Sequence, residues 1–138
     1  DVEIIAKKQI LIEDNVALLD SDLVFFDTDL FSTLVYSNFY FGDCPDWIEK
    51  LCVARRAHIY LLCSCDLTWV KDEFQRVSGE PEKRRQIHAL FDKTLHKHDC
   101  NVVEISGTGQ ARLNQAITAI KKIVCQSHLM VDQNRKSS

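Results

Sequence analysis

Two carboxylates stand where an apolar run ends, in the stretch Leu23-Val-Phe-Phe-Asp-Thr-Asp29. An apolar run without alternation is typical of a strand that is buried on both faces of a parallel sheet. Ligands of such sheets gather beyond the carboxyl ends of the strands, so Asp27 and Asp29 stand where a metal ion or a proton would be handled. A carboxylate that follows a strand is also a common N-cap of the next helix, and both interpretations stay open for each residue.

A charged segment follows a second apolar run, His58–Cys63. It extends from Trp69 to Arg85, and its basic residues include Lys71, Arg76, Arg84 and Arg85. A charge run is usually a solvated face. Here it follows the carboxyl end of an expected strand, where a basic flap would close over phosphate groups, so a functional interpretation stands beside the structural one.

Two other motifs contain residue types that bind zinc. They are Cys63-x-Cys65 and His96-x-His98-x-Cys100. Neither has the ligand spacing of a zinc finger or ribbon, so structural zinc is the minor interpretation. The six cysteines (44, 52, 63, 65, 100 and 125) occur mostly within apolar helix or strand patterns, and we expect them to be reduced and mostly buried.

The elements that must position these residues alternate between helices and strands. We expect helices over Val2–Leu19, Leu30–Phe41, Trp47–Arg56 and Pro81–His96, a last helix through Leu113 to Val124, and strands over Leu23–Phe26, His58–Cys63 and Asn101–Ile105. Asp46 is a candidate cap for the third expected helix. Strands joined by helical crossovers predict an α/β fold, a three-layer parallel sheet with helices on both faces. We expect residues 1–125 to form one domain and residues 126–138 a polar, flexible tail.

Composition limits the partners. Seventeen basic and twenty acidic residues give a net charge of −3, which argues against nucleic acid and acidic membrane surfaces as partners. No apolar run approaches the roughly 20 residues that cross a bilayer. We therefore expect a soluble, cytoplasmic protein, and a homo-oligomer is compatible with the sequence.

Five motifs follow one another in a fixed order between Val2 and Cys125. They are Phe25-Phe26-Asp27-Thr28-Asp29, Cys44-Pro45-Asp46-Trp47-Ile48, Tyr60-Leu61-Leu62-Cys63 followed by Asp66 and Trp69, Ser78-Gly79-Glu80-Pro81-x-x-Arg84, and Arg112-Leu113-x-Gln115-Ala116-Ile117. Together they resemble the ATPase domain of NadR-type ribosylnicotinamide kinases and their AAA relatives. The family flap often reads Trp-Val-x-Asp-Gly-Leu-Arg, whereas here Glu73-Phe74-Gln75-Arg76 follows Asp72, so the glycine is missing and the arginine is shifted by one residue.

The resemblance implies a P-loop NTPase-like fold that binds ATP and Mg²⁺ and transfers a phosphoryl group to a nucleoside-like small molecule. Asp27 would hold Mg²⁺ or accept the proton of the acceptor hydroxyl, and Asp29 would bind the acceptor ribose or the same ion. Arg76 would close on the γ-phosphate, with Lys71, Arg84 and Arg85 as alternatives. The loop Ser106, Gly107, Thr108 and Gly109 would border the adenine, and Tyr36, Tyr40 and Trp47 would frame the acceptor base.

One family feature is missing. The sequence contains no G-x-x-x-x-G-K-[ST] P-loop, and in the family fold the P-loop strand lies between the strands that resemble Leu23–Phe26 and His58–Cys63. We expect the chain to be the carboxyl-terminal part of a longer protein, rather than a remodelled relative that no longer binds ATP. Two rival functions remain: an AAA-like ATP-binding regulatory module without a small-molecule acceptor, and a structural fragment stabilised by another chain.

Overall fold

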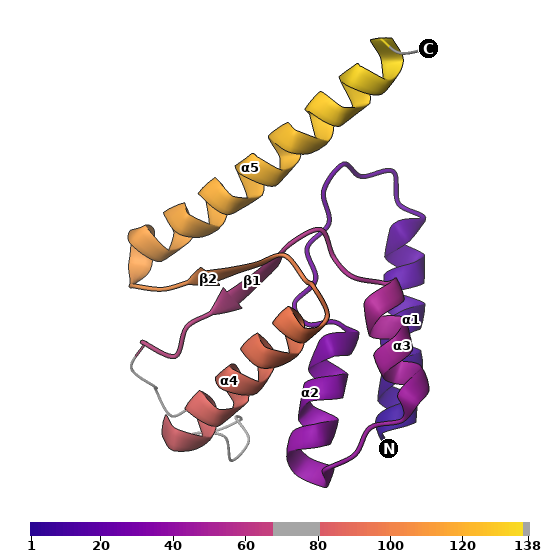
Figure 1. Cartoon of the computed structure of the whole chain (residues 1–138), viewed down its shortest axis with the longest axis vertical. Helices are drawn as coiled ribbons and strands as arrows, with labels where there is room; N and C mark the ends of the chain where they lie inside the picture. Colours follow the sequence, from indigo (N-terminus) through magenta and orange to yellow (C-terminus); the bar gives the residue numbers. More distant parts are fainter. Residues whose placement is uncertain (68–80, 137–138) are drawn as a thin grey trace.

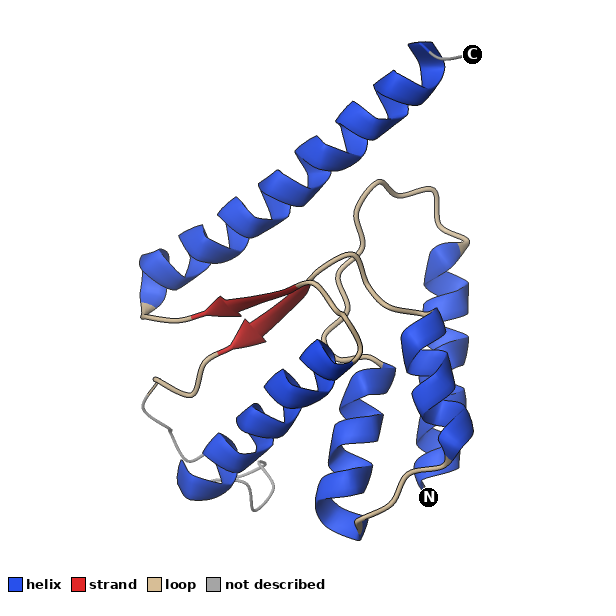
Figure 2. Ribbon diagram, in the orientation of Figure 1, coloured by secondary structure: helices blue, strands red, loops and turns tan. Residues whose placement is uncertain are grey.

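The computed structural model describes residues 1–67 and 81–136, with only the backbone described for residues 127–136. Its helices are α1 (Val2–Ala17), α2 (Leu30–Phe41), α3 (Asp46–Ala54), α4 (Pro81–Lys97) and α5 (Gly109–Lys136), and its strands are β1 (Tyr60–Cys63) and β2 (Val102–Ile105). Figure 1 shows α4 on one side of the strand pair and α5 on the other, with α2 beside α4 and with α1 and α3 beyond α2. The described chain is rich in helix, and its strands are short (Figure 2).

The two strands form a parallel pair that α4 connects. Tyr60 lies opposite Val102, and Cys63 lies opposite Ile105. Both strands therefore end at the same edge of the sheet, as expected for parallel strands joined by a helical crossover. The predicted strands at His58–Cys63 and Asn101–Ile105, and the helix between them, are confirmed within two residues at each end.

The core lies mainly among the helices. Its buried members are Ala6, Leu30, Phe31, Leu34, Ile48, Cys52 and Leu95. The Phe31 ring meets the Tyr60 ring edge to face, with the centroids 5.6 Å apart, and this contact joins α2 to the start of β1. Helix α2 contacts α1, α3 and α4, so these three helices pack around it.

The predicted strand Leu23–Phe26 is wrong, because these residues belong to the loop between α1 and α2. Their exposed fractions range from 38% at Val24 to 67% at Phe25. A strand buried on both faces needs a hydrogen-bonded neighbour and a covering layer on each side. In the described part of the chain, β1 and β2 pair only with each other, so the apolar run has no neighbour with which to form a ladder. The expected three-stranded sheet is therefore a two-stranded parallel sheet among the described residues.

Local signals explain both ends of α2. The Asp29 side chain accepts a hydrogen bond of 2.9 Å from the Phe31 N–H, and Gly42 follows α2 with a φ of 70°. The predicted helix Leu30–Phe41 and the N-cap interpretation of Asp29 are both confirmed. Asp46, however, does not cap α3; it is the first residue of this helix, Pro45 precedes it, and no side-chain hydrogen bond closes the end. A carboxylate in the first turn is favoured there by the helix dipole.

Helix α5 continues to Lys136, so its backbone is helical through most of the segment 126–138 that the sequence predicted to be a tail. None of the helices in the described ranges has the length and hydropathy that a bilayer crossing requires.

The cysteines are free, but they are less buried than the sequence predicted. Cys52 is buried in the core, and its pKa is raised to about 12, mainly by burial. Cys44, Cys65 and Cys100 are partly exposed, while Cys63 and Cys125 are exposed. The prediction that Cys63 is buried was wrong. It relied on the apolar neighbours of Cys63 in the sequence, but the sheet is short and the end of β1 is open to solvent.

Candidate functional site

A pocket of about 350 Å³ opens where β1 and β2 end and α4 begins. It is lined by Ser64, Cys65 and Asp66 after β1, by Pro81, Arg84, Arg85 and His88 of α4, and by Glu104 of β2. The carboxyl edge of a parallel sheet is the usual location of ligand sites in α/β proteins. The sequence predicted basic residues at this edge, and the structure places two of them, Arg84 and Arg85, in the pocket.

The two pocket arginines differ in their partners. Arg85 donates hydrogen bonds of 2.6 and 3.2 Å to the same Glu82 carboxylate oxygen. The Arg84 guanidinium has no hydrogen bond or ion pair with any described residue, although the Arg84 carbonyl accepts a contact of 3.5 Å from the Cys65 thiol. That contact joins the start of α4 to the loop after β1. Arg84 is therefore the pocket cation whose charge the described structure leaves unmatched.

His88 and Glu104 form a second polar pair in the pocket. The His88 Nε2 atom lies 3.6 Å from Glu104 Oε1, too far for a hydrogen bond, and this nitrogen is buried without a partner among the described residues. Neither residue was predicted from the sequence. Their only sequence signal was position: Glu104 interrupts the apolar strand two residues before the Ser106 loop, and His88 lies one helical turn after Arg84.

Arg112 holds together the loops that follow the two strands. Its guanidinium donates to Asp66 Oδ1 at 2.7 Å, to the Ser64 carbonyl at 2.9 Å and to the Gly107 carbonyl at 3.0 Å. Asp66 also accepts a hydrogen bond of 2.5 Å from the Gly107 N–H. The Arg112 hydrogen bond, followed by that of Gly107, lowers the pKa of the Asp66 carboxyl. Arg112, in the first turn of α5, thus fixes Ser64 and Asp66, two residues that line the pocket.

The predicted adenine loop, Ser106 to Gly109, lies beside this pocket. Gln115 binds Ser106 through both main-chain groups, at 3.1 Å to the N–H and 3.0 Å to the carbonyl. Because the N–H groups of Ser106 and Gly107 already have side-chain partners, they are not free donors for a ligand. Thr108 and Gly109 are exposed at the start of α5. Gly107 is joined to Asp66, which lines the pocket with Arg84 and Arg85, and the role of this loop in bordering an adenine stays a prediction.

The Asp29 carboxylate has its hydrogen-bond partners away from the pocket, in α2 and at the start of β1. Besides capping α2, its carboxylate accepts a hydrogen bond of 2.8 Å from the Tyr60 hydroxyl, and Tyr60 is the first residue of β1. Asp29 is therefore tied to the amino end of β1, opposite the pocket. Burial is the largest influence on this carboxyl and raises its pKa. Burial likewise raises the pKa of Tyr60.

Asp27 is exposed in the same loop and pairs with no described residue. Thr28, between the two carboxylates, has a φ of 81°, which is unusual for a β-branched residue. The Thr28 carbonyl accepts a hydrogen bond of 3.3 Å from Gln9 of α1. Neither Asp27 nor Asp29 lines the pocket that contains Arg84.

The aromatic residues predicted to frame an acceptor do not gather at the pocket. Tyr36 and Tyr40 stack on each other along α2, with ring centroids 6.2 Å apart. At a rise of 1.5 Å per residue they lie about 10 and 16 Å along the helix from Asp29. Trp47 packs against the core from α3, and Lys7 of α1 approaches its ring at 6.0 Å. The predicted flap residues Lys71 and Arg76 lie outside the described residues.

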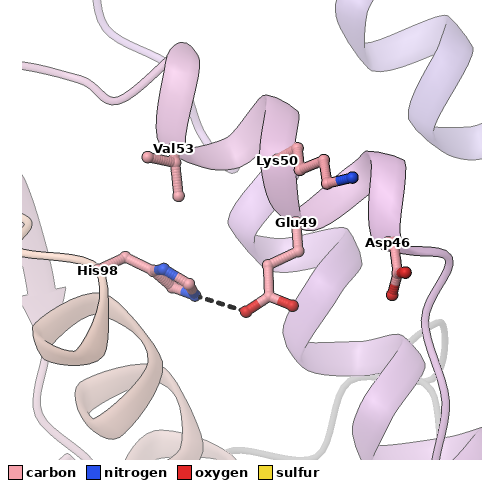
Figure 3. A pocket seen from close by; sticks show the side chains of 5 residues that line it. All are labelled: Asp46, Glu49, Lys50, Val53 and His98. Carbon is pink, nitrogen blue, oxygen red and sulfur yellow. Dashed lines mark ion pairs between the residues drawn. The ribbon is translucent and has the colours of Figure 1, made fainter.

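A second pocket, of about 330 Å³, lies between α3 and the turn after α4. Figure 3 shows its lining side chains, Asp46, Glu49, Lys50, Val53 and His98. One Glu49 carboxylate oxygen lies 3.0 Å from His98 Nε2 and 2.7 Å from Lys97 Nζ, so its charge is matched within the protein. We interpret this cluster as a junction between α3 and α4. Across the described residues, no three side chains of the metal-binding types converge on one point.

Comparison with known proteins gave one result. A family model described as an AAA domain matches residues 1–112, which include every described element up to the start of α5. No match was found among curated proteins or among solved structures.

Proposed function

Because the chain belongs to the AAA domain family, whose members are P-loop-type nucleotide-binding modules, we propose that the pocket at the ends of β1 and β2 binds the phosphates of ATP. The observation that carries this proposal is the guanidinium of Arg84, which pairs with no residue that the structure describes. The other arginines whose side chains the structure describes each have a partner: Arg55 binds Glu13 and Asp14, Arg56 binds the His98 carbonyl, Arg85 binds Glu82 and Arg112 binds Asp66.

The chemistry of the pocket suits a phosphate chain. A guanidinium matches phosphate oxygens with two parallel hydrogen bonds, and it is attracted most strongly where water is partly excluded. Of the two carboxylates in the pocket, Asp66 is neutralised by Arg112 at 2.7 Å. Glu104 has His88 as its neighbour, so the repulsion that it exerts on an anion is reduced when the imidazole is protonated.

The phosphates also need donors that this sequence does not supply. No P-loop is present, so in this proposal the glycine-rich backbone and its lysine are contributed by a different segment. Mg²⁺ in nucleotide sites is held largely by the phosphates with one or two carboxylates. Asp27 does not line the pocket, so it would take that role only after its loop moves.

The finer proposal is phosphoryl transfer to a nucleoside-like acceptor, as in a ribosylnicotinamide kinase. Its support is the carboxylate of Asp27, which no described residue engages, and the exposed Tyr36–Tyr40 ring pair, which offers a stacking surface for a base. In this function Asp27 would orient or deprotonate the acceptor hydroxyl, and Arg84 would stabilise charge on the transferred group.

The second candidate is an ATP-binding regulatory module without an acceptor. The hydrogen bonds of Asp29 favour it, since a carboxylate that caps α2 and binds Tyr60 is not available to an acceptor ribose. Tyr36 and Tyr40 lie about 10 and 16 Å along α2 from Asp29, which is too far for one small acceptor to contact both, and this also favours the regulatory module.

Isothermal titration of Mg·ATP into the full-length protein tests the shared part of both candidates. Arg84→Ala should weaken ATP binding by about 10- to 100-fold, because a hydrogen bond to a charged group is worth about 1.5–3 kcal/mol. Arg56→Ala is the matched control: it removes an arginine that already has a partner outside the pocket, and it should leave ATP affinity unchanged. Equal ATP affinity in wild type and Arg84→Ala would contradict the assignment of the pocket.

Turnover separates the two candidates. If the protein is a kinase, it should phosphorylate a ribosylnicotinamide-type nucleoside, and Asp27→Asn should lower that rate by orders of magnitude while ATP still binds. ATP binding without phosphorylated product would support the regulatory module.

A further inference from the structure

His88 places a ring nitrogen without a hydrogen bond beside the pocket at the ends of β1 and β2. Its Nε2 atom is buried, lies 3.6 Å from Glu104 Oε1 and makes no hydrogen bond with any described residue. In a neutral ring this nitrogen carries either a lone pair or an N–H group. The lone pair would face the Glu104 carboxylate, and the N–H group would stop short of it. A buried polar atom without a partner is costly, so neither neutral form suits this position.

A protonated His88 ring suits the position better. An imidazolium always carries an N–H group at Nε2, and its hydrogen bonds to carboxylates are about 2.7–2.9 Å long. Closing the present gap to Glu104 therefore takes a movement of roughly 1 Å. The Glu104 side chain is 57% exposed, so it has room to make that movement. Histidine is also the side chain that most readily gains a proton between about pH 5 and 8.

The other charges near His88 decide when its ring takes up a proton. The titratable and charged groups that line the pocket beside His88 and Glu104 are Arg84 and Arg85 of α4 and Cys65 and Asp66 of the loop after β1. Three of the charges on or near this face have partners of their own, namely Glu82 for Arg85, Arg112 for Asp66 and His96 for Asp92. Arg84 pairs with no described residue, and its positive charge therefore disfavours a second cation at His88.

A bound phosphate chain reverses this balance. A phosphate group on Arg84 cancels the positive charge that opposes protonation of His88. It also adds negative charge beside Glu104, which favours a proton at the neighbouring imidazole. Because coupling between two binding events is reciprocal, protonation of His88 favours the phosphate by the same factor.

We propose that the His88–Glu104 pair takes up a proton when a phosphate chain enters the pocket, so that ATP binds more tightly as pH falls from about 8 to about 6. His88 is then a positioning residue, because its buried Nε2 atom holds the Glu104 carboxylate and does not need to touch the ligand. The proton comes from the buffer, and no covalent bond of the ligand changes. This inference rests on the proposed function, since it takes the ligand of the pocket to be a phosphate chain.

Isothermal titration of Mg·ATP into the full-length protein, in two buffers of equal pH and different ionisation enthalpy, measures the protons taken up. Near pH 7, wild type should take up a fraction of a proton more than His88→Gln, because glutamine does not titrate. On acidification, the ATP affinity of wild type should rise relative to that of His88→Gln by up to about tenfold per pH unit. Ionisation of ATP itself is common to both proteins and cancels in the comparison.

Glu104→Gln tests the other half of the pair, and it keeps the size of the side chain while removing its charge. At about pH 8 this variant should bind ATP severalfold more tightly than wild type, because the repulsion between the carboxylate and the phosphates is gone. It should also lose most of the proton uptake. The matched control is His96→Gln, which removes a histidine of the same helix whose partner is Asp92 and which does not line the pocket. This control should take up as many protons as wild type.

Equal proton uptake in wild type and His88→Gln would overturn the inference, and so would weaker ATP binding by Glu104→Gln than by wild type at about pH 8. In either case, weaker ATP binding by Arg84→Ala would leave the proposed function standing. Unchanged ATP affinity in Arg84→Ala would overturn both, because ATP would then bind away from this pocket.

Discussion

Replacing Asp29 separates a structural role from a catalytic one. The carboxylate caps α2 through the Phe31 N–H at 2.9 Å and accepts the Tyr60 hydroxyl at 2.8 Å. Loss of an N-cap side chain costs about 1 kcal/mol of unfolding free energy. Removing the acceptor of the partly buried Tyr60 hydroxyl costs about 1–3 kcal/mol more. Relief of the burial that raises the Asp29 pKa offsets part of this loss, so we expect Asp29→Ala to lower the unfolding free energy by about 2 kcal/mol.

Asp29→Asn adds a test of the pH dependence. Asparagine caps helices as well as aspartate does, so this variant should lose little stability near neutral pH. The Asp29 pKa is raised above its ordinary value of 3.8, which means that the folded protein binds this proton more tightly than the unfolded chain. The stability linked to the proton is fully present below pH 3.8 and is lost as pH rises through the raised pKa. Wild type should therefore lose stability relative to Asp29→Asn as pH rises from 3.8 toward neutrality.

Urea unfolding followed by far-ultraviolet circular dichroism measures both effects. Asp27→Ala is the control, because Asp27 is exposed and pairs with no described residue, and its loss should change the unfolding free energy by less than about 0.5 kcal/mol. These roles of Asp29 are refuted if Asp29→Ala unfolds like the Asp27 variant, or if wild type gains stability over Asp29→Asn as pH rises.

Two further predictions follow from the thiols and from the Arg112 contact. In the native protein, Cys63 and Cys125 should react first with a thiol reagent, because they are exposed. Cys52 should react only on unfolding, since it is buried and burial raises its pKa to about 12. Unfolded protein should yield six thiols, and a smaller number would indicate disulfides or bound metal. Asp66→Ala should speed hydrogen exchange at the Gly107 amide severalfold and lower the thermal midpoint. Because the pKa of Asp66 is lowered in the folded protein, its carboxylate stabilises the fold above pH 3.8, and the stability advantage of wild type should vanish as pH falls below 3.8. Unchanged exchange at Gly107 would contradict the contact.

The fold was predictable wherever a local signal agrees with the packing. Asp29 and Gly42 mark the ends of α2 by capping and by a left-handed turn, and both are legible in the sequence. The crossover from β1 through α4 to β2 follows from the order of apolar runs. Leu23–Phe26 was not predictable in the same way, because a strand depends on a neighbour, and apolar character alone does not supply one.

The candidate site was only partly predictable for a related reason. Arg84 and Arg85 could be placed at the carboxyl edge because the charged segment that contains them follows the expected strand His58–Cys63. His88 of α4 and Glu104 of β2 meet in the pocket, and Arg112 of α5 binds Asp66 in the loop that lines it. These contacts depend on how α4 and α5 cover opposite faces of the sheet (Figure 1). Contacts between residues of different elements cannot be predicted from the residue spacing within a single segment.

The pocket and the carboxylates belong to separately supported parts of the fold, and this bears on the choice between kinase and regulatory module. Arg112 and Gln115 of α5 hold the loops that follow β1 and β2. Among the described residues, two hydrogen bonds join the loop between α1 and α2 to other elements: that of Asp29 with Tyr60 and that of Thr28 with Gln9. Thr28 holds a backbone conformation that costs a β-branched residue on the order of 1–3 kcal/mol. A kinase must bring Asp27 to the phosphates bound near Arg84, so in a kinase this loop has to move, and release of strain at Thr28 would favour that movement. A regulatory module needs no such movement, and in it Thr28 and the hydrogen bonds of Asp29 would stay unchanged when ATP binds.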